Sequence, residues 1–221
     1  MSFAVRKRAR GATAAMTHPL LPVLRRARLV PVVRTSTAAL AERACQWLRE
    51  AGCGIVEITL TIPDAIPLIR TLAAEPGLIV GAGTVPDAAA ADACLHAGAR
   101  FLVTPWVDPA VIRAANQAGA AALPGALTPT EVRAALAAGA DAVKIFPASS
   151  AGGPAHIRAL CSVFPGVAFC PTGGVDATTL PAYLAAGAAF VGIGGKLVDE
   201  AKLAAGDKAA ILAAARAAMG A

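Results

Sequence analysis

Two charged side chains lie in stretches of sequence that otherwise have the composition of buried strands. Lys144 lies within AVKIFPA (142–148), and Glu57 lies within IVEITL (55–60). Apolar surroundings disfavour the charged form of a lysine, and the neutral amine can attack a ketone to form an imine. A neighbouring carboxylate can carry the protons of that reaction. The pair therefore predicts Schiff-base chemistry with Lys144 as nucleophile and Glu57 as proton shuttle. A buried structural ion pair is the alternative.

Glycine pairs end two strand-like stretches nearer the C-terminus. Gly173-Gly174 ends AFCPTGG (168–174), and Gly194-Gly195 ends FVGIGG (190–195) and is followed by Lys196. At the ends of the last two strands of a parallel barrel, backbone N–H groups commonly bind phosphate. We therefore expect a phosphate site at the two pairs, with Lys196 as an added cation. Two plain turns and a solvated lysine are the alternative.

The stretches that must position these groups recur in a regular order. Ala-rich helical stretches end in Ala-Gly and are followed by short apolar runs, as expected where glycine takes the left-handed conformation after a helix. Eight runs are predicted as strands, at 29–33, 55–60, 78–84, 101–105, 121–126, 142–148, 168–174 and 190–195. Helices are predicted to begin at Thr37, Pro63-Asp64, Pro86-Asp87, Asp108-Pro109, Thr128-Pro129 and Asp176. This order predicts an α/β protein with a single (β/α)8 TIM barrel; an open doubly wound sheet is the alternative.

The composition fits one barrel and excludes several classes of protein. The chain has 221 residues, 57% of them hydrophobic and 15% charged, which is enough for one barrel and too apolar for disorder. The net charge of +6 is concentrated near the N-terminus and aromatic residues make up only 4%, so we expect no nucleic-acid partner. No apolar run has the length of a membrane span, and no signal peptide is evident. Five cysteines without a C-x-x-C pair indicate reduced thiols and a cytoplasmic protein.

Residues 1–16 lie outside the pattern of strands and helices. They are rich in basic residues, so we expect a disordered extension there and the barrel in residues 17–221. His18 lies close to the N-terminus, and His96 and His156 lie in predicted helices, which argues against a metal site. The sequence has no G-x-S-x-G nucleophile motif, and IVGAGTV lacks the third glycine of a dinucleotide site, so no cofactor is expected.

Seven short motifs, in this order, are similar to those of one family. They are VEITL (56–60), VGAGTV (80–85), TP (104–105), LPGALTPTE (123–131), KIFPAS (144–149), FCPTGGV (169–175) and GIGG (192–195). From about Leu29 to Val198 the chain resembles the 2-keto-3-deoxy-6-phosphogluconate (KDPG) and 4-hydroxy-2-oxoglutarate (KHG) aldolases. The resemblance implies a metal-free, homotrimeric lyase of carbohydrate metabolism, in the Entner–Doudoroff route. Its substrate would be a 2-keto acid: a 2-keto-3-deoxy-6-phospho sugar acid cleaved to pyruvate and glyceraldehyde 3-phosphate, or 4-hydroxy-2-oxoglutarate cleaved to pyruvate and glyoxylate.

The resemblance also implies roles for individual residues. Lys144 would form the Schiff base, and Glu57 would be the general acid and base. Thr84 would help hold the carboxylate of the 2-keto acid, and Pro105 and Phe146 would wall the pocket. The substrate phosphate would be bound by Thr172, Gly173, Gly174, Gly194, Gly195 and, in this chain, Lys196.

Three positions depart from the family pattern. Thr61 stands where well-known members have a carboxylate-binding arginine. The sister enzymes that act on 2-keto-3-deoxy-6-phosphogalactonate also lack that arginine and have one at the end of the first strand, where this chain has Arg34. We therefore expect Arg34 to supply the charge. Lys196 replaces a common serine and Trp106 a smaller residue, so the preferred aldehyde partner stays open.

Two other functions fit the same predicted barrel. A phosphate-binding epimerase or isomerase would use Glu57 as a base and Lys144 only as an electrostatic partner. A non-catalytic barrel would bind phosphorylated metabolites without turnover. The aldolase alone is expected to form an imine with pyruvate.

Overall fold

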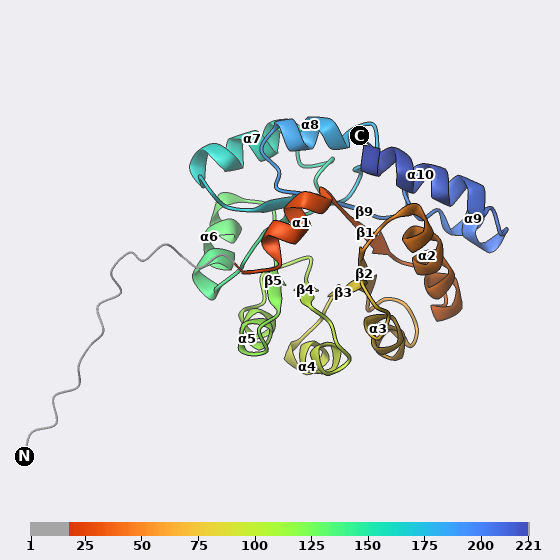
Figure 1. The fold of residues 1–221 in the computed structure, drawn as a ribbon. Helices are drawn as coiled ribbons and strands as arrows, with labels where there is room; N and C mark the ends of the chain where they lie inside the picture. The colour runs from red at the N-terminus through yellow and green to blue at the C-terminus, as the bar shows by residue number, and fades with distance from the viewer. Residues whose placement is uncertain (1–17, 221) are drawn as a thin grey trace, which may run out of the picture.

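The computed structural model describes residues 18–220, which form a ring of parallel strands surrounded by helices (Figure 1). The predicted extension, residues 1–16, lies outside the described residues. The strands are β1 (Leu29–Val33), β2 (Ile55–Thr59), β3 (Ile79–Gly83), β4 (Phe101–Val103), β5 (Ala121–Leu123), β6 (Gly125–Ala126), β7 (Val143–Ile145), β8 (Phe169–Pro171) and β9 (Val191–Ile193). The helices are α1 (Leu21–Ala27), α2 (Ala38–Ala51), α3 (Ala65–Ala73), α4 (Ala88–His96), α5 (Pro109–Gln117), α6 (Pro129–Ala138), α7 (Gly153–Val163), α8 (Leu180–Ala185), α9 (Glu200–Ala204) and α10 (Lys208–Gly220).

The strands follow one another around the barrel. One sheet has the order β5-β4-β3-β2-β1-β9, and the other has the order β6-β7-β8. Only Pro124 separates β5 from β6, and a parallel bridge between Thr172 and Gly192 joins β8 to β9. The predicted (β/α)8 barrel is therefore confirmed. The fifth predicted strand, 121–126, is interrupted at Pro124, because proline has no N–H group for the strand ladder.

Most of the predicted helix starts and ends have the expected local chemistry. The side chains of Thr37, Asp87, Asp108 and Thr128 accept hydrogen bonds from backbone N–H groups in the first turns of α2, α4, α5 and α6. Two starts differ. Asp64 has the left-handed conformation with φ 56° and makes no side-chain cap, and Asp176 accepts bonds from Thr178 N and Thr179 N in a turn just before α8. The glycines of the five Ala-Gly steps, at 52, 98, 119, 139 and 187, all have positive φ, as left-handed helix ends require.

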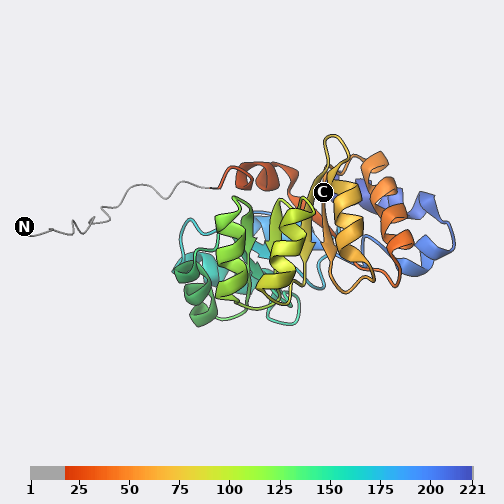
Figure 2. The same cartoon turned by 90° about the horizontal axis from the view of Figure 1, so that it is seen from below.

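The buried apolar residues form two layers. A large cluster lies between the strands and the surrounding helices, and a smaller one fills the inside of the barrel with residues such as Phe101, Leu123 and Phe190. Helix α1 lies across the end at which the strands begin, and Leu21 and Leu24 pack into the inner cluster (Figure 2). Apolar side chains therefore cover the inside of the barrel at that end, and polar side chains inside the barrel are expected at the opposite end.

The helices of the described residues are too short or too polar to cross a bilayer.

Candidate active site

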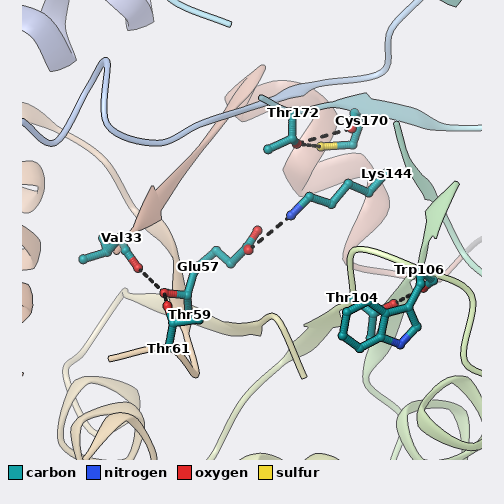
Figure 3. A network of polar contacts seen from close by, with 9 residues as sticks. All are labelled: Val33, Glu57, Thr59, Thr61, Thr104, Trp106, Lys144, Cys170 and Thr172. Atoms are coloured by element: carbon teal, nitrogen blue, oxygen red, sulfur yellow. Dashed lines mark hydrogen bonds and ion pairs between the residues drawn. The ribbon is translucent and has the colours of Figure 1, made fainter. Parts of the chain in front are cut away.

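Lys144 and Glu57 meet inside the barrel, as the sequence predicts. Lys144 lies at the centre of β7 and is 6% exposed, and Glu57 lies at the centre of β2 and is 4% exposed. The Nζ atom of Lys144 is 3.6 Å from the Oε1 atom of Glu57 (Figure 3). Oε1 is fully buried and has no hydrogen-bond partner within residues 18–220. The amine and the carboxylate thus form an ion pair at a distance longer than a good hydrogen bond.

Cys170 and Phe146 are neighbours of Lys144 inside the barrel. Cys170 is its register partner on β8, and burial raises the pKa of the Cys170 thiol to about 12. Cys170 therefore stays a neutral thiol, which is a poor nucleophile compared with a thiolate. The ammonium group of Lys144 also lies 5.5 Å from the centre of the Phe146 ring.

Lys144 lines a cavity of about 190 Å³ at the ends of strands β1, β7, β8 and β9. Nine of the predicted site residues surround this cavity: Arg34, Lys144, Phe146, Thr172, Gly173, Gly174, Gly194, Gly195 and Lys196. Glu57, Thr84 and Pro105 are not part of its lining. Glu57 reaches Lys144 from β2, and Thr84 and Pro105 follow β3 and β4. Val32 and Val175 line it as well, and the sequence did not single them out.

One of the two glycine turns has a conformation that other residues resist. Gly173 and Gly174 have φ values of 92° and 75°. The carbonyl of Gly173 accepts a hydrogen bond from Ser149 N, and the carbonyl of Gly194 accepts bonds from Leu197 N and Val198 N. The turns are therefore held by their carbonyl groups. The Gly173-Gly174 turn packs against the loop that follows β7, and Gly194 lies near Val32 of β1.

The charged residues that line the cavity are all cationic. Arg34, Lys144 and Lys196 line it, and no aspartate or glutamate of the described residues is part of its wall. A cleft with charges of one sign raises the local concentration of ligands of the opposite sign. A larger cavity, about 560 Å³, lies at the other end of the barrel beside α1 and is lined mainly by apolar residues such as Leu20, Val23 and Leu78. The charges thus mark the smaller cavity as the place for an anionic substrate.

Thr84 has an unusual backbone conformation directly after β3. Its φ is 56°, which is disfavoured for a β-branched residue. Strained residues of this kind cluster at functional sites.

Within residues 18–220, His, Cys, Asp and Glu side chains do not gather in groups of three or more that could hold a metal ion.

Comparisons with known proteins identify the family of the chain. Residues 21–214 match the family described as "Aldolase: KDPG and KHG aldolase". The chain belongs to this family. It is 37% identical to the 2-dehydro-3-deoxy-phosphogluconate aldolase of Zymomonas mobilis over 162 residues, which are 73% of this chain and 78% of that protein. It is 40% identical to the 2-dehydro-3-deoxy-6-phosphogalactonate aldolase of Escherichia coli over 173 residues, 76% of this chain and 83% of that protein.

A solved aldolase shows the same fold. The KDPG aldolase from Legionella pneumophila, crystallised with pyruvate captured as a covalent carbinolamine, superposes with a TM-score of 0.82. It is 30% identical, and the match covers 90% of this chain and 97% of that chain. The family favours the aldolase over the epimerase alternative.

The positions at which this aldolase-family chain departs from the family pattern can now be placed. Thr61 supplies no cation, and its hydroxyl is 2.9 Å from that of Thr59, which itself donates to the carbonyl of Val33 (Figure 3). Arg34, in contrast, lines the cavity of Lys144. The side chain of Trp106, after β4, is 47% exposed and does not line the cavity of Lys144.

Sequence reasoning missed the glycine that borders Glu57. A Cβ atom added to Gly83 would be 2.8 Å from both Cγ and Cδ of Glu57. The signal in the sequence is a glycine inside a strand, which often marks a close approach of another group. Nothing in the sequence says which group approaches.

Proposed function

We propose that this chain is a class I aldolase that cleaves a 2-keto-3-deoxy-6-phospho sugar acid to pyruvate and glyceraldehyde 3-phosphate. One observation carries the proposal: a buried lysine, Lys144, lies 3.6 Å from a buried carboxylate, Glu57, and opens to a cavity lined with cations. The capture of pyruvate as a carbinolamine in the Legionella relative supports the same chemistry.

The reaction begins when the neutral amine of Lys144 attacks the C2 carbonyl carbon of the substrate. Glu57 transfers a proton to the resulting hydroxyl group, which leaves as water and gives a protonated imine. Glu57, now a carboxylate, takes the proton of the C4 hydroxyl while the imine withdraws the electrons of the C3–C4 bond, so an aldehyde departs and an enamine remains. Glu57 then returns a proton to C3, and hydrolysis releases pyruvate and the free amine.

The other residues bind the two ends of the substrate. Arg34 holds the carboxylate and Phe146 walls the pocket, both from the lining of the cavity. Thr84 and Pro105, which follow β3 and β4, receive the same two roles from the family resemblance alone. Two groups of residues take the phosphate: Thr172 with Gly173 and Gly174, and Gly194 with Gly195 and Lys196. The positive lining of the cavity supports this assignment, because the substrate is anionic at both ends. The non-phosphorylated 4-hydroxy-2-oxoglutarate is a second substrate, cleaved to pyruvate and glyoxylate at the same lysine.

The assembly and location of the enzyme belong to the same proposal. We propose a cytoplasmic homotrimer, which follows the family resemblance. All five cysteines are free thiols, which suits a reducing compartment. Leu60, Ile66, Pro67 and Pro86 line a pocket on the outside of the barrel and are partly or fully exposed, so they offer apolar surface that subunit contact would bury.

Borohydride reduction in the presence of pyruvate tests the proposal. Reduction of the imine leaves a stable adduct, which intact mass and peptide mapping are expected to place on Lys144. An epimerase that uses Glu57 as a base forms no such adduct. Folded protein that yields no adduct would exclude class I aldolase chemistry.

Replacing Arg34 with alanine is expected to raise the KM for the 2-keto acid roughly tenfold and to change kcat less. The reason is that hydrogen bonds to a charged group contribute more than neutral ones, and exposure of the guanidinium reduces the gain. Steady-state kinetics measure the effect, with Arg70→Ala on α3 as the control arginine. An unchanged KM would show that Arg34 does not bind the carboxylate.

Replacing Lys196 with alanine is expected to lower kcat/KM for a phosphorylated substrate about two- to fivefold, the range of an exposed ion pair. The loss should shrink as salt is added, because exposed charges are screened. Cleavage of 4-hydroxy-2-oxoglutarate, which has no phosphate, serves as the internal control. An equal loss with both substrates would contradict a role in phosphate binding.

A further inference from the structure

The side chain of Glu57 occupies the place that a side chain on Gly83 would take. Gly83 ends β3, and Glu57 lies on the neighbouring strand β2, whose residue Thr59 is the register partner of Gly83. A Cβ atom built on Gly83 would overlap Oε1 of Glu57 and would lie 2.8 Å from Cδ and Cγ. Real Cβ atoms do not approach other atoms closer than 3.0 Å. Glu57 can therefore lie where it does only because residue 83 has no side chain.

The backbone of Gly83 does not itself require glycine. Its φ lies outside the positive region, in contrast to Gly173 and Gly174, whose φ values are 92° and 75°. An alanine could adopt the strand conformation of Gly83 without strain. Position 83 excludes a side chain because the Glu57 carboxylate occupies the space that a Cβ atom would need.

Few other contacts fix the carboxylate of Glu57. Oε1 has no hydrogen-bond partner in the described part of the chain, and the Nζ atom of Lys144 is 3.6 Å away. An ion pair at this distance leaves the carboxylate free to turn, whereas direct contact with the backbone of β3 limits where it can lie. The side chain of Glu57 thus packs against the backbone of Gly83, where no Cβ atom stands between them.

Gly81, one pleat earlier on β3, gives a useful contrast. A Cβ atom there would overlap the ring of its register partner Phe101, which belongs to the inner apolar cluster. The space left by the missing side chain is therefore filled by a different neighbour at each of the two glycines. Gly81 makes room for the core, and Gly83 makes room for the carboxylate that faces Lys144.

We propose that Gly83 is a positioning residue for proton transfer, because its missing side chain lets the Glu57 carboxylate lie against β3 and face the Lys144 amine. The inference rests on the proposed aldolase function and adds a residue that acts only through Glu57. A methyl group at position 83 must push the carboxylate into another rotamer. A displacement of about 1 Å at a reacting group is enough to cost about 100-fold in rate.

The Gly83→Ala variant tests this with pyruvate as the probe. In D2O the pyruvate imine loses a C3 proton to form the enamine and regains a deuteron, and proton NMR follows the exchange of the methyl group. We expect exchange and aldol cleavage to fall about 100-fold, while prolonged borohydride treatment still gives the adduct on Lys144. Exchange at the wild-type rate in Gly83→Ala would overturn the proposal. Wild-type protein that forms no pyruvate adduct would instead refute the aldolase function itself.

A double-mutant cycle separates positioning from damage to the strand. In a Glu57→Ala background there is no carboxylate to displace, so adding Gly83→Ala should cause no further loss of exchange. If Gly83→Ala alone fails to fold, Glu57→Ala should restore folding by removing the collision, and failure of both to fold would overturn the proposal. Gly81→Ala is the matched control: it is expected to lower the midpoint of thermal unfolding through Phe101 and to keep exchange per folded molecule. An equal loss of exchange in both glycine variants would also overturn it.

Discussion

Replacing Lys144 with arginine is expected to lower the turnover of the aldol cleavage on the order of 10⁶-fold, the scale of loss seen when a covalent nucleophile is removed from an enzyme. Arginine keeps a positive charge near Glu57, but a guanidinium does not deprotonate in proteins and cannot form an imine. The substitution therefore separates the two interpretations of the buried pair. A structural ion pair would tolerate arginine, whereas a Schiff base would not.

The measurement combines cleavage kinetics with borohydride trapping by pyruvate. The variant should give no adduct at position 144 while keeping a cooperative thermal transition. Lys208→Arg is the matched control, because Lys208 pairs with Glu50 at 2.6 Å on the exposed side of the molecule. Cleavage by Lys144→Arg at more than a few percent of the wild-type rate would show that the lysine is only an electrostatic partner. Alanine is a poorer choice at position 144, because leaving Glu57 buried without a partner costs about 3–5 kcal/mol of stability.

The fold could be predicted from the sequence because its signals are local. An Ala-Gly step fixes a helix end through the conformation of one residue, as the φ of 101° at Gly139 shows. The buried runs differ from helices in length, and a charge within such a run is unusual, so Lys144 and Glu57 could be predicted as site residues. The interruption at Pro124 and the uncapped start at Asp64 are smaller local effects. They shift element boundaries without changing the order of strands.

The arrangement of the site could be predicted only in part, because it depends on which strand ends meet around the rim. The sequence grouped Thr84 with Arg34 as carboxylate ligands, yet only Arg34 lines the cavity of Lys144. Their distance depends on the curvature of the sheet, which no local pattern encodes. The contact between Gly83 and Glu57 could not be predicted from the sequence for the same reason. A missing side chain has meaning only when the neighbour that fills its space is known.

Replacing Glu57 with glutamine is expected to lower turnover by about 10²–10⁴-fold, the usual contribution of general acid–base catalysis. Glutamine keeps the shape of the side chain against Gly83 and removes its ability to exchange protons. The imine should still form slowly at Lys144, so borohydride trapping is expected to go to completion over a longer time.

Stability measurements decide between this catalytic role and a structural one. If Glu57 served only to neutralise Lys144, its loss would destabilise the protein by about 3–5 kcal/mol, as removal of one partner of a buried pair does. The folded fraction would then turn over normally. Urea unfolding of Glu57→Gln measures this, with Glu75→Gln as a control, because Glu75 pairs with Arg49 in an exposed ion pair that contributes less than about 1 kcal/mol. A buried lysine can lose its proton instead of staying unpaired, and the catalytic role needs that neutral amine. We therefore expect a small loss of stability together with a large loss of turnover, and the reverse pattern would contradict the proposed proton shuttle.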